Sequence, residues 1–182
     1  VVRLVGSEMC IRDSPNSKSN YRKRSRARFE EKLSSNPIYD SIKLVNLNGS
    51  LAEPSSVDAV VTFRNLHNWI GSSVDSIFKN SFIALKSGGI LGVVEHRAPS
   101  GTSVDSMKKS GYVTENYAIE AAQNAGFVML GKSGINSNPK DTADHPKGVW
   151  TLPPNLRLQD QDREKYLAIG ESDRMTLLFR KP

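Results

Sequence analysis

Buried strands alternate with amphipathic helices along the middle of the sequence, and this alternation constrains the fold more than any other feature. Residues 58–64 and 90–94 carry the β-branched and aliphatic side chains of strands that are buried on both faces. Between them, residues 73–86 place apolar side chains at helical spacing, with Ser73 as the expected N-cap. Strands that alternate with helices in this way form a parallel sheet between helices. The sequence therefore predicts a doubly wound α/β fold.

The remaining elements extend the same alternation in both directions. A long polar segment, residues 134–172, interrupts it before the last strand and has helical character only near residues 160–167. Loops of that length inside a domain are usually functional or disordered, and length alone does not choose between the two. The further expected elements are a helix over residues 19–33, a strand over 42–47, a helix that Thr114 caps, a strand over 127–130 and a strand over 175–179.

Length, composition and charge indicate a globular protein of ordinary composition. The 182 residues, of which 37% are hydrophobic and 24% charged, predict one globular domain. No apolar run has the roughly 18 residues that a membrane helix needs, so no membrane association is expected. The net charge of +6 includes a basic run at residues 18–28 that could contact nucleic acid. Glu30, Glu31 and an apolar stripe favour a solvated helix face instead, and a nucleic-acid partner is not expected.

The N-terminal residues do not look like part of a natural protein. The stretch LVGSEMCIRDS, residues 4–14, reads as the translation of a sequencing-library adapter, so we treat residues 1–14 as a non-native segment and residues 15–182 as the domain. Cys10 is the only cysteine and lies inside this segment. Disulfides and thiol chemistry are therefore excluded for the rest of the chain. Deleting residues 1–14 is expected to leave the melting temperature unchanged.

Polar side chains follow two neighbouring strands where each strand ends. The segment Arg64–Trp69 follows the strand 58–64, and Glu95 and His96 follow the strand 90–94. Because ligands of open parallel sheets bind outside the carboxyl ends of the strands, these residues are expected to form a site rim. The alternative is that these residues have only structural roles: Leu66 and Trp69 pack within a loop, and His67 forms a hydrogen bond to the backbone.

The histidines are candidate bases and weak candidates for metal ligands. His67 or His96 could accept a proton near neutral pH. The three histidines are 29 and 49 residues apart, and none has a second ligand residue at local spacing. This pattern predicts no metal site.

Several motifs, taken together, resemble a known enzyme family. ALKSGGILGVVEH, residues 84–96, and AAQNAGFVML, residues 121–130, resemble the C-terminal half of class I S-adenosylmethionine-dependent methyltransferases, and MTLLFRKP fits their antiparallel last strand. FRNLHNW, EHRAPSG, SGYV and NPKDTADHPKGVW resemble a bacterial group of predicted methyltransferases. The resemblance implies a Rossmann-like, mostly parallel sheet with an antiparallel last strand and the strand order 3-2-1-4-5-7-6. In it, residues 58–64 correspond to the fourth strand, and LKSGG ends the helix that follows.

The resemblance implies methyl transfer from S-adenosylmethionine to an unidentified acceptor. It assigns catalytic roles to His67, His96 and Glu95. The cofactor would be held by Asn48, Arg64, Asn65 and Trp69, although Asn48 stands where the family often has an acidic residue. The implied substrate-binding residues are Asn68, Tyr112, Asn138, His145 and Trp150. The last three lie in residues 134–172, which are therefore a candidate substrate lid.

Other parts of the family pattern do not occur in the sequence. The first two strands, the glycine-rich loop and the acidic residue that ends the second strand have no counterpart. We therefore expect an incomplete methyltransferase domain that binds the cofactor poorly and is inactive as it stands. The alternatives are a catalytically inactive relative that binds a ligand or partner, a basic nucleic-acid-binding module and another doubly wound enzyme such as a dehydrogenase. Compartment, cytoplasmic or exported, and oligomeric state are not predicted.

Overall fold

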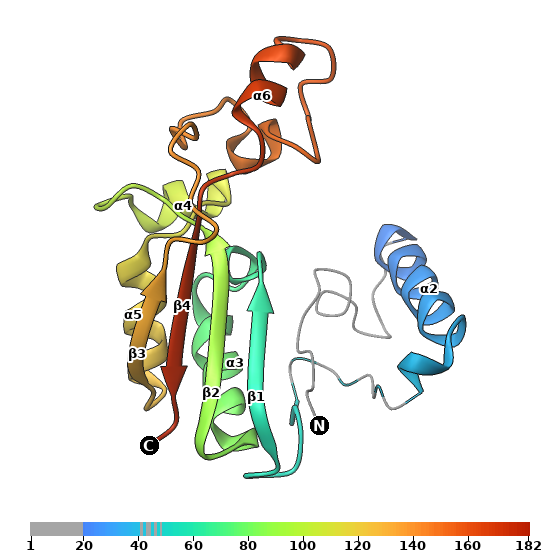
Figure 1. The fold of residues 1–182 in the computed structure, drawn as a ribbon, viewed down its shortest axis with the longest axis vertical. Helices are drawn as coiled ribbons and strands as arrows, with labels where there is room; N and C mark the ends of the chain where they lie inside the picture. The colour runs from blue at the N-terminus through green and yellow to red at the C-terminus, as the bar shows by residue number, and fades with distance from the viewer. Residues whose placement is uncertain (1–19, 41, 43–44, 46, 48) are drawn as a thin grey trace.

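A computed structural model describes residues 20–40, 42, 45, 47 and 49–182, and its centre is a four-stranded sheet (Figure 1). The strands are β1 (Val57–Phe63), β2 (Leu85–His96), β3 (Val128–Ser133) and β4 (Arg174–Arg180). Their order across the sheet is β1-β2-β4-β3, with β1 parallel to β2 and β4 antiparallel to both of its neighbours. This order is that expected for the fourth to seventh strands of the predicted fold, so the fold prediction is confirmed.

Two helices cover one face of the sheet. Helices α3 (Ser72–Ala84) and α5 (Glu115–Asn124) lie side by side behind the strands in Figure 1. Their apolar side chains pack with the buried residues of β2 and β4 into one core, which includes Phe78, Val93 and Phe179. Thr114 caps α5 as predicted, because its hydroxyl accepts a hydrogen bond from the backbone N–H of Tyr117. The other helical elements are α2 (Asn20–Ser34), α4 (Val104–Ser110), α6 (Arg163–Ile169), η1 (Pro37–Tyr39), η2 (Leu66–Asn68) and η3 (Gly148–Thr151).

The opposite face of the sheet is apolar and is left uncovered by the described helices. It forms a shallow groove of about 400 Å³ whose lining includes Val61, Phe63, Val94, Leu130 and Leu178. Phe63 and Leu130 are 45% and 49% exposed. The prediction of strands buried on both faces is therefore wrong for this part of the chain. The side chains have the apolar character that two-sided burial requires, but α2 lies away from the sheet (Figure 1).

Several predicted boundaries also differ from the structure. LKSGG does not end a helix: Leu85 pairs with Val57, and Gly88 donates its N–H to the carbonyl of Lys181, so the segment begins β2. Helix α3 begins one residue before Ser73, and its N-cap is Gly71. Half of the predicted strand 42–47 lies outside the described residues, and the three residues of it that are described are not in a strand.

Sequence inspection missed α4, although its signals are present. Ser103 caps it through a hydrogen bond from the N–H of Ser106, and Gly111 ends it in the left-handed conformation. The segment 134–172 lies beyond the carboxyl ends of β1 and β2 and contains η3 and α6 (Figure 1). None of the helices in the described part is long and apolar enough to cross a membrane.

Candidate functional site

A buried carboxylate joins the carboxyl ends of β1 and β2. Glu95, the penultimate residue of β2, is fully buried, and its two oxygens accept the backbone N–H groups of His67 and His96 at 3.0 and 2.8 Å. The Nδ1 atom of His67 lies 3.1 Å from Oε1 of the same carboxylate. The two imidazole rings have their centroids 5.5 Å apart. The predicted proximity of the two strand ends is thus confirmed.

The surroundings of Glu95 decide its charge. Burial by itself raises the pKa of the carboxyl, but the hydrogen bond from His67 and the charges of His67 and His96 outweigh it and hold the pKa below its usual value. The carboxylate is therefore ionised at neutral pH. It fixes the backbone at the start of η2 and the orientation of the His67 ring.

Both ring nitrogens of His67 are engaged by the protein. Nδ1 faces Glu95, and Nε2 lies 3.1 Å from the side-chain nitrogen of Asn68. Asn68 also donates to the amide oxygen of Asn65 at 2.8 Å. The ring is buried, with 4% of the side chain exposed. Both ring nitrogens thus have a protein partner, and the ring is held as a fixed part of the cluster.

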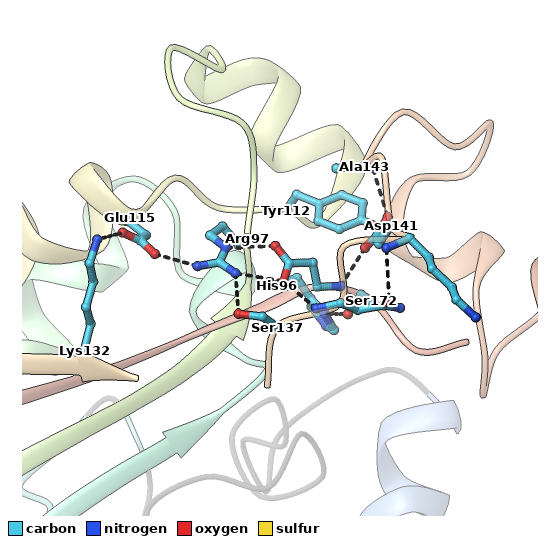
Figure 2. Close-up of polar contacts among 12 residues, drawn as sticks. His96, Arg97, Tyr112, Glu115, Lys132, Ser137, Asp141, Ala143 and Ser172 are labelled. Carbon is cyan, nitrogen blue, oxygen red and sulfur yellow. Dashed lines mark hydrogen bonds and ion pairs between the residues drawn. The ribbon is translucent and has the colours of Figure 1, made fainter. Parts of the chain in front are cut away.

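His96 differs from His67 because one of its ring nitrogens has no hydrogen-bond partner. Its Nδ1 lies 2.5 Å from the hydroxyl of Ser172 (Figure 2). Its Nε2 is 3.9 Å from Glu95 Oε1, too far for a hydrogen bond, and meets no other polar partner in the described part. Burial lowers the pKa of His96 to about 4; Glu95 opposes this shift, while His67, Arg64 and Arg174 add to it. The imidazole is neutral at pH 7.

Several buried polar atoms near the end of β1 lack partners. They are Thr62 Oγ1, Asn65 Nδ2 and Trp69 Nε1, and on β4 the Nε atom of Arg174. Arg64 sits between the strand and η2 with φ of 52°, which a residue with a bulky side chain rarely adopts. Its half-buried side chain makes no hydrogen bond or ion pair within the described part of the protein. Unsatisfied donors and a strained backbone at one strand end are typical of a ligand site.

The long segment 134–172 is tied to the site by a second buried carboxylate, Asp141. Its oxygens accept the Tyr112 hydroxyl at 2.9 Å (Figure 2) and the backbone N–H of Asp173 at 2.7 Å. His145 Nε2 lies 2.8 Å from Oδ1 of the same carboxylate. Burial raises the pKa of Tyr112, and the charge of Asp141 raises it further. The Tyr112 hydroxyl is therefore a permanent donor to Asp141.

Aromatic rings from this region surround the histidines. Trp150 meets His67 edge-on at 6.0 Å between ring centroids, and Tyr112 meets His96 at 6.2 Å. The predicted lid therefore brings Trp150 to the cluster. His145 lies against Tyr166 instead, and the Asn138 amide donates to the carbonyls of Ile169 and Glu171 within its own segment. Trp69 is packed in the hydrophobic core, and Asn48 lies outside the described residues.

Two residues that tie this site together were not singled out from the sequence. Ser172 positions His96, but a serine at the end of a polar segment carries no sequence signal. Arg97 binds both oxygens of Asp173 and also reaches Glu115 and Ser137 (Figure 2). Its position directly after EH, at the end of a buried strand, could have indicated a role at the strand end.

Asp141→Ala is expected to loosen the segment 134–172. The change leaves Tyr112, His145 and two backbone N–H groups without their acceptor, at a cost of about 3 kcal/mol or more. We expect faster amide hydrogen exchange and faster limited proteolysis in this segment. Asp144→Ala is the matched control, because that carboxylate lies on the exposed surface. Equal protection in both variants would contradict the anchoring role of Asp141.

The chain is similar to known proteins in its three-dimensional structure, but no match was found by sequence. No protein-family model and no curated protein sequence matches the chain. A proposed sarcosine dimethylglycine methyltransferase from Galdieria sulphuraria superposes with a TM-score of 0.58 at 16% identity over 87% of this chain and 66% of its own. A geranyl diphosphate methyltransferase in complex with S-adenosylmethionine gives 0.54 at 12% identity, over 90% of this chain and 66% of its own. The [4+2]-cyclase SpnF gives 0.55 at 17% identity, over 90% of this chain and 63% of its own.

These matches establish the fold: the described part has the class I fold of S-adenosylmethionine-dependent methyltransferases. The chain spans 63–66% of the length of the three structures. One of the three is named as a cyclase, so the fold by itself does not determine the reaction.

Proposed function

We propose that the whole protein, of which this chain carries the site described above, transfers the methyl group of S-adenosylmethionine to an acceptor bound at the carboxyl ends of β1 and β2. The proposal rests on one observation above all. The Glu95 carboxylate, two imidazoles and several unpartnered donors gather where this fold binds its ligands. A buried titratable cluster at a strand end is a candidate site on physical grounds.

The residues at the end of β1 fit part of the cofactor. Asn65 and Trp69 each keep a buried N–H without a partner, and a bound polar ligand would supply the missing acceptors. We assign Arg64, Asn65 and Trp69 to the cofactor, with Asn48 as a further proposed contact outside the described residues. When bound, S-adenosylmethionine supplies a methyl group on a positively charged sulfur, which the acceptor displaces in line.

The protein's own contribution is to position the acceptor and exclude water. Glu95 fixes His67, and the aromatic rings of Trp150 and Tyr112 shield the two imidazoles. His67 and His96 are the candidate bases, and Nε2 of His96 is the ring nitrogen left without a hydrogen bond. Asn68, Asn138 and His145 remain proposed substrate contacts. Bringing the acceptor to the methyl group in a dry pocket supplies much of the rate in such a displacement.

A protein that binds a ligand at this site without methyl transfer is the second candidate. The observation that favours it is the low pKa of His96, about 4, which makes the neutral imidazole a weak base at pH 7. Ligand binding together with an absence of S-adenosylhomocysteine formation would select this alternative.

Nuclear magnetic resonance of the ¹⁵N-labelled chain tests the proposal. We expect S-adenosylmethionine at millimolar concentration to shift the amide signals of residues 64–69 and 95–97, with an affinity weaker than micromolar. The affinity is weak because the sequence has no glycine-rich loop to hold the methionine end of the cofactor. The control is Asn65→Leu, which removes the unpartnered amide and should abolish the shifts. Perturbations confined to other parts of the sheet, or none at all, would contradict the proposed site.

A further inference from the structure

The cluster that joins β1 and β2 has the composition of a metal site, although no local sequence pattern shows it. His67, Glu95 and His96 each offer one ligand atom, and the three atoms lie within 4.8 Å of one another. All three residues are buried, with at most 8% of any of them exposed. We propose that His67 Nδ1, Glu95 Oε1 and His96 Nε2 bind a divalent first-row transition metal such as Zn²⁺.

The distances require only small movements of the side chains. His67 Nδ1 is 3.1 Å and His96 Nε2 is 3.9 Å from Glu95 Oε1. Around a tetrahedral ion with bonds near 2.1 Å, two ligand atoms are about 3.4 Å apart. The carboxylate oxygen is thus slightly too close to one nitrogen and slightly too far from the other. Rotations of the two rings would correct both distances, and they would also have to bring the two nitrogen atoms, which lie within 4.8 Å of each other, to the same separation.

The atoms behind the three ligands form the outer support that metal ligands commonly have. The other nitrogen of His96 meets the Ser172 hydroxyl at 2.5 Å, and the carboxylate is held by two backbone N–H groups. Metal-bound histidines nearly always use the second ring nitrogen in this way, because it fixes the ring and its tautomer. The metal would also give His96 Nε2 the partner that it lacks.

His67 needs its proton on Nε2 when Nδ1 binds the metal, and the two neighbouring amides can accommodate this. As placed, Asn68 directs its side-chain nitrogen both to His67 Nε2 and to the amide oxygen of Asn65. The side-chain nitrogen of Asn65 is then buried without a partner. Turning both amides by 180° lets Asn68 accept from His67 and from Asn65. The Asn65 oxygen then takes the place of the unpartnered nitrogen, so that in the metal-bound form Asn65 would accept a hydrogen bond from the cofactor instead of donating one.

The donor set and the charges indicate which ion and which fourth ligand fit. Two imidazoles and one carboxylate favour zinc or iron(II) over magnesium and calcium, which prefer oxygen ligands. Three protein ligands leave one position open. Arg64 and Arg174 lie close enough to affect His96, so the site is electropositive once the ion is bound. An anionic fourth ligand, either hydroxide or an ionised acceptor oxygen, is therefore favoured.

The catalytic meaning of this ion rests on the proposed function, whereas its binding does not. The ion would lower the pKa of a bound acceptor O–H, whose proton would pass to water. The acceptor oxygen would then form a bond to the methyl carbon as the methyl–sulfur bond breaks, and the sulfonium would become a neutral thioether, so charge and atoms balance. In that case the two histidines act as ligands and not as bases.

Zinc titration of the chelator-stripped chain tests the site without cofactor or acceptor. The experiment uses Cys10→Ser as background, because that residue is the only thiol in the sequence. We expect one Zn²⁺ per chain by calorimetry and elemental analysis, a higher melting temperature with Zn²⁺ and no response to Mg²⁺. His96→Ala should abolish the binding. Ser172→Ala should weaken it by roughly 10–100-fold, since it removes only the outer support of a ligand.

His145→Gln is the matched control, because this histidine lies beside Asp141 and outside the cluster; its zinc affinity should equal that of the background protein. Circular dichroism establishes that each variant is folded, and a cobalt(II) spectrum of tetrahedral type gives an independent readout. A folded chain that binds no zinc, or whose zinc binding survives both His96→Ala and Ser172→Ala, would overturn the inference. Either result leaves the cofactor titration, and with it the proposed function, untouched.

Discussion

Glu95→Ala is expected to lower the free energy of unfolding of the metal-free protein by about 3–5 kcal/mol. The carboxylate is fully buried and is the acceptor for two backbone N–H groups and for the His67 ring. Alanine removes all three bonds and leaves these buried donors without an acceptor. For a chain of this length the melting temperature should fall by roughly 10 °C or more. Thermal unfolding followed by circular dichroism measures the change.

Glu95→Gln and Asp58→Ala serve as controls for this loss. Glutamine keeps one acceptor oxygen but turns an NH₂ group toward the other donors, so its effect should be intermediate. Asp58 also lies on a strand, at the edge of the sheet, and pairs with Lys86, but its side chain is 62% exposed. Its removal should change the melting temperature little, because exposed ion pairs contribute little. If Glu95→Ala unfolded at the wild-type temperature, Glu95 would not be the link between the two strand ends.

Gly148→Ala should detach η3 from the body of the protein. Gly148 has φ of 55°, and a Cβ atom there would lie 2.0 Å from the carbonyl oxygen and 2.5 Å from the Cα of Ser110. Both are backbone atoms at the end of α4, so rotation of a side chain cannot relieve the overlap. Strain and overlap together should cost about 3 kcal/mol or more. Val149 and Trp150, which pack against Gly111, would separate from it.

Thermal unfolding measures the loss of stability in Gly148→Ala, and tryptophan fluorescence measures the detachment of η3. Trp69 is buried in the core and Trp150 lies on the long segment, so quenching by acrylamide should increase through Trp150. Gly131→Ala on β3 is the matched control, since a Cβ atom there meets nothing within 4 Å and its backbone conformation suits any residue. Similar stability and quenching in the two variants would show that the close approach of Gly148 to α4 is dispensable.

The fold was predictable from the sequence to a large extent because its signals are local. The apolar residues of β1, β2 and β4, the helical spacing of α3 and the cap at Thr114 each depend on neighbours within a few residues. The boundary between α3 and β2 was not predictable in this way. LKSGG reads as a helix end, yet its pairing with Val57 and with Lys181 places it in the sheet. Pairing between distant segments outweighs local preference at such positions.

The sequence alone determined the class of fold and the strand ends at which the site lies, because strand order and the polar segment after each strand are encoded locally. Only the tertiary structure decided how the site is built. His67, Glu95 and Ser172 are far apart in the chain, yet the structure places each of them within hydrogen-bond distance of another member of the cluster. The residues of the cluster follow no local pattern in the sequence because they come from three separate segments. These segments meet only because β1 pairs with β2 in parallel and β4 pairs with β2 antiparallel. Register between strands is fixed by packing and by ladder hydrogen bonds, and these form only when the whole sheet assembles.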